Sequence, residues 1–140
     1  MAPLPGGQPA YTEVTREVRV TVRTWFLGDQ SEPERGHFVW AYRVAIANEG
    51  RRTVQLLERT WLITDAHGRT QRVHGKGVVG EQPVLDPGES FEYTSGTPLA
   101  TPSGFMRGTY HMVAVESGEA FDVEIPGFSL DSPHQPSAVH

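Results

Sequence analysis

Phe38-Val39-Trp40-Ala41-Tyr42-Arg43-Val44-Ala45-Ile46-Ala47 is the most regular stretch of this 140-residue sequence. Every second position from Phe38 to Ile46 carries a large apolar side chain, and the positions between them are mostly small. A helix would place Phe38 and Trp40 on different faces, whereas a strand places alternate side chains on one face. The stretch therefore predicts a β-strand with one buried face.

The same period of two recurs on both sides of this strand. Upstream, Val18, Val20 and Val22 alternate with charged or hydroxyl-bearing residues, which predicts another half-buried strand. Residues 53–64 are also extended in character, but the apolar phase changes between Leu56 and Leu57, which predicts a β-bulge or a strand break there. Further strands are expected at 69–74, 89–95, 105–115 and 120–125, separated by turn sequences that contain Gly, Asn or Asp.

These patterns together predict the fold class. No stretch shows a sustained 3.6-residue period, and 15 Gly and 11 Pro residues supply many turns. We predict an all-β fold, an antiparallel two-sheet sandwich of about seven or eight short strands. We expect the sandwich at residues 13–130, between a flexible N-terminal segment at 1–12 and a flexible C-terminal tail at 131–140.

Composition argues against several classes of function. The formal net charge of −5 argues against general binding to nucleic acid or to an acidic membrane surface. The absence of Cys excludes disulfides, thiolate catalysis, Cys-ligated zinc and iron–sulfur clusters. No apolar run is long enough to span a membrane, and residues 1–7 lack the features of a secretory signal, so we expect a cytoplasmic protein.

One stretch, Gly75-Lys76-Gly77-Val78-Val79-Gly80, fits the pattern G-x-G-x-x-G. The dinucleotide-binding version of this pattern needs a helix after the last glycine, so that the helix N-terminus can face a pyrophosphate. Pro83 and the turn sequence at 86–88 leave no room for that helix. We therefore reject a Rossmann-type site.

Three interpretations of this glycine loop remain open. The glycines can simply permit positive φ and close backbone approach in a crossing between sheets. The loop can instead contact a protein or peptide. In the third interpretation, its N–H groups form an anion-binding concavity for a phosphate or carboxylate. The candidate ligand-binding residues are then Arg72, His74, Gly75, Lys76, Gly77 and Gly80.

Other sets of reactive side chains give weaker signals. His67, His74 and His111 lack the spacing of metal ligands, so we expect no metal site. G-x-S-x-G is absent, and nothing ties Ser90 or Ser95 to a His and an acid, so we expect no enzyme activity. The carboxylates of the last expected hairpin are interpreted as a solvated face; they are Glu116, Glu119, Asp122 and Glu124.

Basic residues recur on the expected outer face of one sheet. Arg19 and Arg23 share the outward side of the strand around residues 18–23, and Arg43 takes the corresponding side of the strand at 38–47. Interleaved Glu residues favour ordinary exposed side chains here. Binding of single-stranded nucleic acid would need outward aromatic residues, and on the first strand only Trp25 qualifies, so we expect no nucleic-acid partner.

An ordered series of motifs resembles the ApaG family. It spans residues 14–130 and consists of FVWAYRV (38–44), NEG (48–50), VQLL (54–57), RTWLIT (59–64), GKGVVGEQP (75–83), PGE (87–89), YTSG (93–96), GFMRG (104–108), YHM (110–112) and IPGFSL (125–130). The resemblance implies a fibronectin type III-like β-sandwich. ApaG-like domains also occur in F-box proteins that recruit substrates, which implies a protein-interaction role. Stand-alone bacterial members are linked to cobalt resistance and magnesium homeostasis.

The family's glycine motif maps onto Gly75, Gly77 and Gly80, where the resemblance suggests nucleotide or pyrophosphate binding. The family pattern has an acidic residue between the first two glycines. Lys76 stands there in this sequence and reverses the local charge.

These observations lead to a ranked set of functional hypotheses. The first is a non-catalytic interaction module, without a cofactor, in which a sheet edge or the glycine loop meets a protein partner. The alternative is a small-molecule binder of phosphorylated ligands, nucleotide or pyrophosphate, at the glycine loop. A direct role in metal handling ranks third. Exposed edge strands are compatible with either a monomer or a homodimer.

Overall fold

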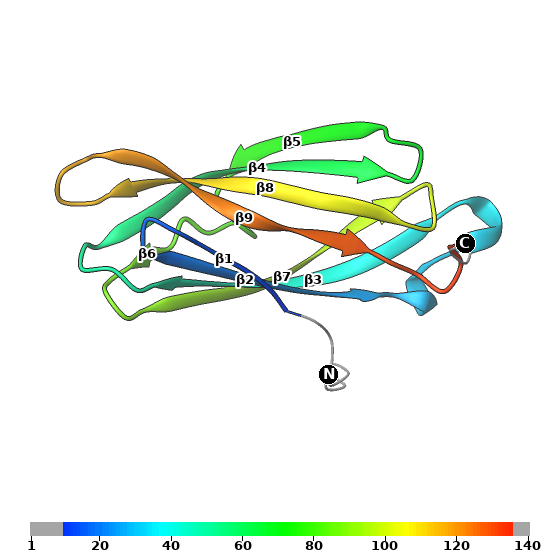
Figure 1. The fold of residues 1–140 in the computed structure, drawn as a ribbon, viewed down its shortest axis with the longest axis horizontal. Helices are drawn as coiled ribbons and strands as arrows, with labels where there is room; N and C mark the ends of the chain where they lie inside the picture. The colour runs from blue at the N-terminus through cyan, green and yellow to red at the C-terminus, as the bar shows by residue number, and fades with distance from the viewer. Residues whose placement is uncertain (1–9, 136–140) are drawn as a thin grey trace.

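The computed structural model of the protein describes residues 10–135, and nearly all of its regular structure is β. Two antiparallel sheets lie one above the other (Figure 1). The first sheet has the strand order β1-β2-β3-β7, with β1 (Tyr11–Thr15), β2 (Val18–Phe26), β3 (Phe38–Asn48) and β7 (Ser90–Leu99). The second has the order β5-β4-β8-β9, with β4 (Val54–Asp65), β5 (Thr70–Lys76), β8 (Gly104–Ala114) and β9 (Ala120–Leu130), while the short β6 (Val84–Leu85) also pairs with β4. The predicted all-β sandwich is confirmed.

The alternation of side chains along the strands explains which face each strand buries. On β3 the large residues from Phe38 to Ile46 are buried, and those between them are half-buried. On β2, Val18, Val20 and Val22 are buried beside them. Trp25, expected to be an outward aromatic, is only 7% exposed, so it is covered and cannot serve as a stacking platform.

β4 contains the predicted bulge. Its pairing with β8 shifts register between Leu56 and Glu58, which leaves Leu57 as the extra residue. The bulge lets Leu56 before it and Trp61 after it both face the core, with exposed fractions of 0% and 3%. The phase change seen in the sequence therefore has the predicted physical cause.

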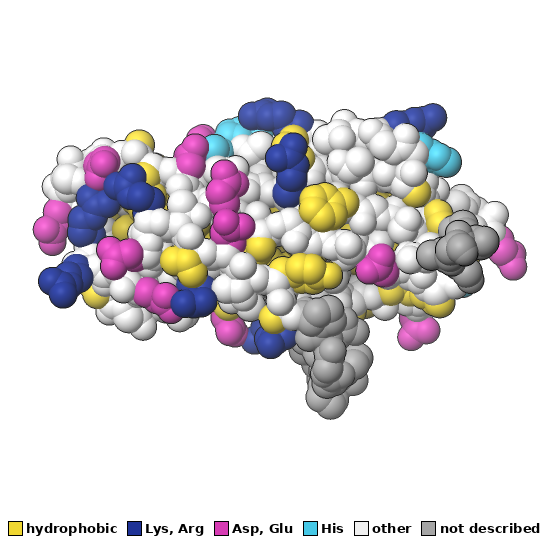
Figure 2. Space-filling model, in the orientation of Figure 1, with side chains coloured by type: hydrophobic (Ala, Val, Ile, Leu, Met, Phe, Trp, Pro, Cys, Tyr) yellow, Lys and Arg dark blue, Asp and Glu magenta, His cyan; other side chains and the backbone are white. Residues whose placement is uncertain are grey.

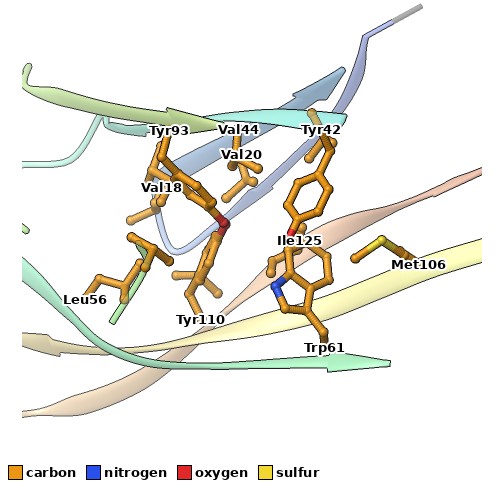
Figure 3. Close-up of a cluster of buried hydrophobic side chains, with 14 of the residues drawn as sticks. Val18, Val20, Tyr42, Val44, Leu56, Trp61, Tyr93, Met106, Tyr110 and Ile125 are labelled. Atoms are coloured by element: carbon orange, nitrogen blue, oxygen red, sulfur yellow. The ribbon is translucent and has the colours of Figure 1, made fainter. Parts of the chain in front are cut away.

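The two sheets are joined by aromatic side chains from opposite layers (Figure 3). The rings of Tyr42 on β3 and Trp61 on β4 have centroids 5.4 Å apart, and Trp61 also meets Phe128 of β9 at 5.9 Å. The hydroxyls of Tyr93 on β7 and Tyr110 on β8 point at each other and form a hydrogen bond between the sheets.

The glycine loop lies within one sheet. It joins β5 to β6, and both of these strands pair with β4. The expectation that the glycines lie in a crossing between sheets was therefore wrong. The chain crosses only after Leu85, where the turn at residues 86–88 hydrogen-bonds to β3 through Gly88 N and Asn48 O at 2.8 Å.

The ends of the described chain lie against the sandwich. β1 begins at Tyr11, two residues before the expected start of the domain. At the other end, Trp40 Nε1 donates to Asp131 O at 2.8 Å, and Ser132 Oγ donates to Pro102 O at 2.6 Å. Residues 1–9 and 136–140, which make up most of the expected flexible segments, lie outside the described residues.

Candidate functional site

The glycine loop ends in a two-residue hairpin. Val78 and Glu81 exchange backbone hydrogen bonds of 2.8 and 2.9 Å, and the two residues between them, Val79 and Gly80, have φ values of 42° and 83°. Positive φ at both central positions is typical of a type I′ turn. The two-residue strand β6 follows at Val84, with no helix between it and Gly80, so no helix N-terminus stands here to face a pyrophosphate.

Each glycine of the motif has a local structural reason. Gly75 pairs with Arg59, and a Cβ at Gly75 would collide with the Arg59 guanidinium. Gly77 has a φ of 63°, and a Cβ there would collide with the Glu81 carbonyl. Gly80 needs its positive φ for the turn.

The backbone N–H groups of the loop are largely engaged within the protein. Gly77 N donates to Leu57 O at the β4 bulge at 2.8 Å, and the N–H groups of Val78 and Glu81 close the hairpin. Leu57 O also accepts from Gln82 Nε2 at 3.0 Å, which ties the far side of the loop to the same carbonyl. An anion-binding concavity would need such N–H groups to be free, so phosphate binding here stays a prediction that this geometry does not favour.

The candidate residues from the sequence divide between the two faces of the second sheet. Arg72, His74 and Lys76 lie on the outer face of β5, since their partners on β4 alternate with the buried Trp61. Gly75 faces inward, beside Arg59. In Figure 2, basic side chains and His line the upper border of the molecule, where β5 runs. The structure thus does not bring Arg72, His74 and Lys76 together with the inner side of the loop.

A chain of hydrogen bonds crosses this outer face. Thr60 Oγ1 lies 2.8 Å from His74 Nδ1 and 2.8 Å from His111 Nε2, and His111 Nδ1 lies 2.9 Å from Asp122 Oδ1. A carboxylate only accepts, so one tautomer that satisfies this chain has His111 donating from Nδ1 and accepting the Thr60 proton at Nε2. Thr60 then accepts from His74. Within residues 10–135 no group of three His, Asp or Glu side chains is arranged to hold a metal ion.

A cleft opens on the inner side, between the edge strands β5 and β7. Its volume is about 350 Å³. Polar groups of Tyr42, Arg59 and Ser95 line it together with apolar side chains that include Trp61 and Val79. This size is at the lower end of the range of about 300–1,000 Å³ that is typical of ligand pockets.

Arg59 is the functional candidate that the sequence reasoning missed. It has the same parity as Trp61 and Ile63, so a charged residue stands on the inward face of β4; that parity was a signal available in the sequence. Its Nη1 donates to the carbonyls of Lys76 and Gly77 at 3.3 and 3.2 Å. No carboxylate in the described part of the chain forms an ion pair with it.

Tyr42 and Tyr93 line the cleft together with Arg59, and Tyr110 is buried behind them against Tyr93. Burial raises the pKa of Tyr42, Tyr93 and Tyr110, and the nearby Arg59 charge acts in the opposite direction on all three. The phenols therefore keep their protons at neutral pH, and the Tyr93–Tyr110 pair serves as a hydrogen bond between sheets.

Val79 lines the cleft and has both an unfavourable backbone conformation and an exposed apolar side chain. It is a β-branched residue with positive φ, and it is also 56% exposed. Asn, Asp or Gly would satisfy this turn position without strain. Strained backbone is found more often at functional positions, and Val79 combines it with an exposed apolar side chain at the cleft, so we treat Val79 as a candidate contact residue.

The remaining candidates behave as ordinary surface residues. Arg19 and Arg43 form ion pairs with Glu49 and Glu92 at 2.9 and 2.6 Å. No helix among the described residues is long and apolar enough to cross a membrane. The carboxylates interpreted as a solvated face are all exposed; they are Glu116, Glu119, Asp122 and Glu124.

Comparison with known proteins gives consistent relatives. A family model described as the ApaG domain matches residues 28–114. The sequence is 68% identical over 124 residues to Protein ApaG of Rhodospirillum centenum, covering 89% of this chain and 95% of the relative. It is 65% identical over 125 residues to Protein ApaG of Paramagnetospirillum magneticum, with coverages of 89% and 95%. The crystal structure of a Bordetella pertussis protein described as ApaA superposes with a TM-score of 0.81 at 46% identity, covering 91% of this chain and 98% of that one.

Proposed function

The chain belongs to the ApaG family, and we propose that it is a non-catalytic protein-interaction module whose binding face is the open side between β5 and β7. The partner is a protein segment in extended conformation, and the site needs no cofactor. We expect this module to act in the cytoplasm as a monomer or homodimer. A partner involved in metal-ion balance would account for the link to cobalt resistance and magnesium homeostasis that the family resemblance implies.

The observation that carries this proposal is the state of Val79. An exposed apolar side chain on a strained backbone lowers the stability of the free protein. Contact with a partner would bury the side chain and use the rigid hairpin as a preformed surface. Val78, its neighbour, is 1% exposed and anchors the hairpin in the core, so the tip at Val79 is held in a fixed place.

The free edge of β7 can form backbone hydrogen bonds with an added strand from a partner. β7 pairs only with β3, which leaves its other edge unpaired in the described structure. The segment from Tyr93 to Thr97 carries no charged residue, and Pro98, which lacks an N–H, ends the usable edge. By contrast, the free edge strand β5 carries Arg72 and Lys76, and charged residues commonly protect an edge from pairing. An added strand would therefore pair with β7 and pass beneath Val79.

The test uses the variant Val79→Asn, which relieves the backbone strain and removes the exposed apolar side chain at the tip of the hairpin. Asn followed by Gly80 is a preferred type I′ sequence, so we expect the free energy of unfolding to rise by about 1 kcal/mol. We first capture a partner protein from a cell extract on the wild-type chain. The affinity of Val79→Asn for this captured partner should be about tenfold weaker, because an apolar contact is lost. Chemical denaturation and calorimetric titration measure the two effects.

Glu17→Gly is the matched control. Arg16 and Glu17 form the other two-residue turn with positive φ, at 51° and 66°, and this turn lies on β1–β2 at the opposite edge of the first sheet. Glu17→Gly should also stabilise the protein but leave partner affinity unchanged. If Val79→Asn binds the partner as tightly as the wild type, the loop is not part of the binding face.

A further inference from the structure

Arg59 differs from the arginines that the fold uses for its own ion pairs. Arg16 and Arg52 share Glu119, Arg19 pairs with Glu49, and Arg43 pairs with Glu92. All of these lie on the exposed surface. Arg59 faces inward, is half-buried, and has no acidic partner among residues 10–135.

The guanidinium retains unused donors. Both contacts of Arg59 to the loop carbonyls are made by Nη1. Nε and Nη2 form no hydrogen bond with any described residue, and neither is a fully buried polar atom, so water reaches them. Arg presents five N–H donors in a planar fork that matches the two oxygens of a carboxylate.

The charge of the cleft is opposite to that of the whole protein. The chain carries a formal net charge of −5, yet Arg59 is the one charged residue that lines the cleft in the described structure. Neutral hydroxyl and amide groups of Tyr42, Ser95 and Gln71 lie along the same lining. A single cation between apolar and aromatic walls suits a ligand that bears one negative charge on an extended, partly apolar body.

A carboxylate fits this cleft better than a phosphate does. A phosphate group at neutral pH carries close to two negative charges and is commonly held by several cations or by free backbone N–H groups. The basic residues nearest in sequence, Arg72 and Lys76, lie on the outer face of the sheet. The N–H groups of Gly77, Val78 and Glu81 are engaged within the loop.

We propose that the cleft recognises a carboxylate of the partner segment and that Arg59 binds it. The inference rests on the proposed interaction function and specifies its chemistry: an extended acidic peptide pairs with β7 and places a carboxylate on the free Nε–Nη2 side of Arg59. The carboxylate comes from an Asp or Glu side chain or from a peptide C-terminus, and the experiment separates these sources.

The test is an NMR titration of the wild-type protein with three peptides of matched length. The first is acetyl-Thr-Val-Glu-Val-Thr-amide, the second has Gln in place of Glu, and the third is the Gln peptide with a free C-terminal carboxylate. We expect the Arg59 Nε–H signal and the amide signals of β7 to shift with a carboxylate peptide. Affinity for the neutral Gln peptide should be at least about tenfold weaker, since a hydrogen bond to a charged group is lost. The carboxylate peptide that binds more tightly shows whether Arg59 recognises an acidic side chain or a peptide C-terminus.

Two variants distinguish recognition of the carboxylate by Arg59 from the hydrogen bonds that Arg59 donates to the loop carbonyls. Arg59→Lys keeps the positive charge but lacks the planar fork, so it should bind the carboxylate peptide about tenfold more weakly. Arg72→Gln removes one positive charge from the outer face of β5 and should bind like the wild type at moderate salt. Amide spectra of each free variant show whether residues 76–81 keep their positions.

Several results would overturn the inference. The Glu and Gln peptides could bind equally, none could bind at millimolar concentration, or the shifts could map to the outer face of the second sheet. Larger Arg59 shifts with inorganic pyrophosphate than with the carboxylate peptides would instead favour a phosphorylated ligand. If Val79→Asn no longer binds the partner while the Glu and Gln peptides bind the wild type equally well, the proposed protein-interaction function is supported and the proposed recognition of a carboxylate is wrong. If Arg59 binds the carboxylate while Val79→Asn captures the partner normally, the cleft chemistry stands and the proposed role of the hairpin fails.

Discussion

At the scale of single residues, the glycine motif is explained by neighbours that are distant in sequence. Gly75 gives space to Arg59, and Gly77 gives space to the Glu81 carbonyl. The sequence could show that glycines were needed here, but not why. Only the pairing of β4 with β5 brings Arg59 opposite Gly75.

The glycines should therefore differ in their tolerance of substitution. Gly80→Ala forces a positive φ on a residue with free space around it, and should cost about 1 kcal/mol of stability. Gly77→Ala combines positive φ with a collision against backbone, and should cost about 2–4 kcal/mol. Urea denaturation of both variants gives the comparison. Equal costs would show that the Glu81 carbonyl can move aside.

Arg59 shows why the site was harder to predict than the fold. The parity of β4 placed a charge on the buried face, yet sequence alone could not tell whether an acid would neutralise it. That question is decided by which strands lie beside and above β4. The predicted ligand-binding residues Arg72, His74 and Lys76 do lie on β5, which borders the cleft. Alternation along β5, however, turns their side chains to the outer face, away from the cleft.

At the scale of strands and sheets, alternation predicted most of the structure. The strands at 18–26 and 38–48 and the bulge of β4 followed from the period of large side chains. The prediction omitted β1 and β6, because β1 has little apolar alternation and β6 has only two residues. It also placed the glycine loop between sheets, because sequence does not reveal that β5 and β6 share β4 as a partner.

The hydrogen bond between Tyr93 and Tyr110 ties β7 to β8 across the sandwich. Tyr93→Phe leaves the fully buried Tyr110 hydroxyl without its partner, and should cost about 1–3 kcal/mol. The double variant Tyr93→Phe/Tyr110→Phe removes both hydroxyls and should cost less than the sum of the single variants. Thermal and chemical unfolding of the four proteins completes the cycle. Additive losses would mean that the two hydroxyls do not interact.

For the molecule as a whole, the buried phenols of Tyr93 and Tyr110 make the free energy of unfolding depend on pH in the alkaline range. Burial raises the pKa of Tyr93 and Tyr110 above the ordinary value of 10.0, so the folded protein keeps protons that the unfolded chain releases. Their contribution is complete below pH 10 and is lost as pH rises toward the higher folded pKa values. Each tyrosine can lower stability by at most about 1.4 kcal/mol per pH unit in that range.

The double Phe variant provides the control for this alkaline effect. Its free energy of unfolding should fall less steeply above pH 10 than that of the wild type, as measured by urea denaturation between pH 8 and 11. Identical slopes would show that other groups cause the alkaline loss of stability.

The sandwich as a whole has one open side and one closed side. Thr15 of β1 reaches β9 through a hydrogen bond from Glu124 N to its hydroxyl at 3.2 Å, which closes one side. On the other side, β5 and β7 leave the cleft between them. A partner bound at this open side would cover the free edge of β7 and the tip of the glycine loop.

Amide hydrogen exchange on the complex shows which side of the sandwich the partner covers. With the captured partner bound, we predict slower exchange at Tyr93–Gly96 of β7 and at Val79–Gly80, and unchanged exchange in β1 and β9. Slower exchange confined to β1, β9 or the outer face around His74 and His111, with β7 unaffected, would show that the partner binds elsewhere.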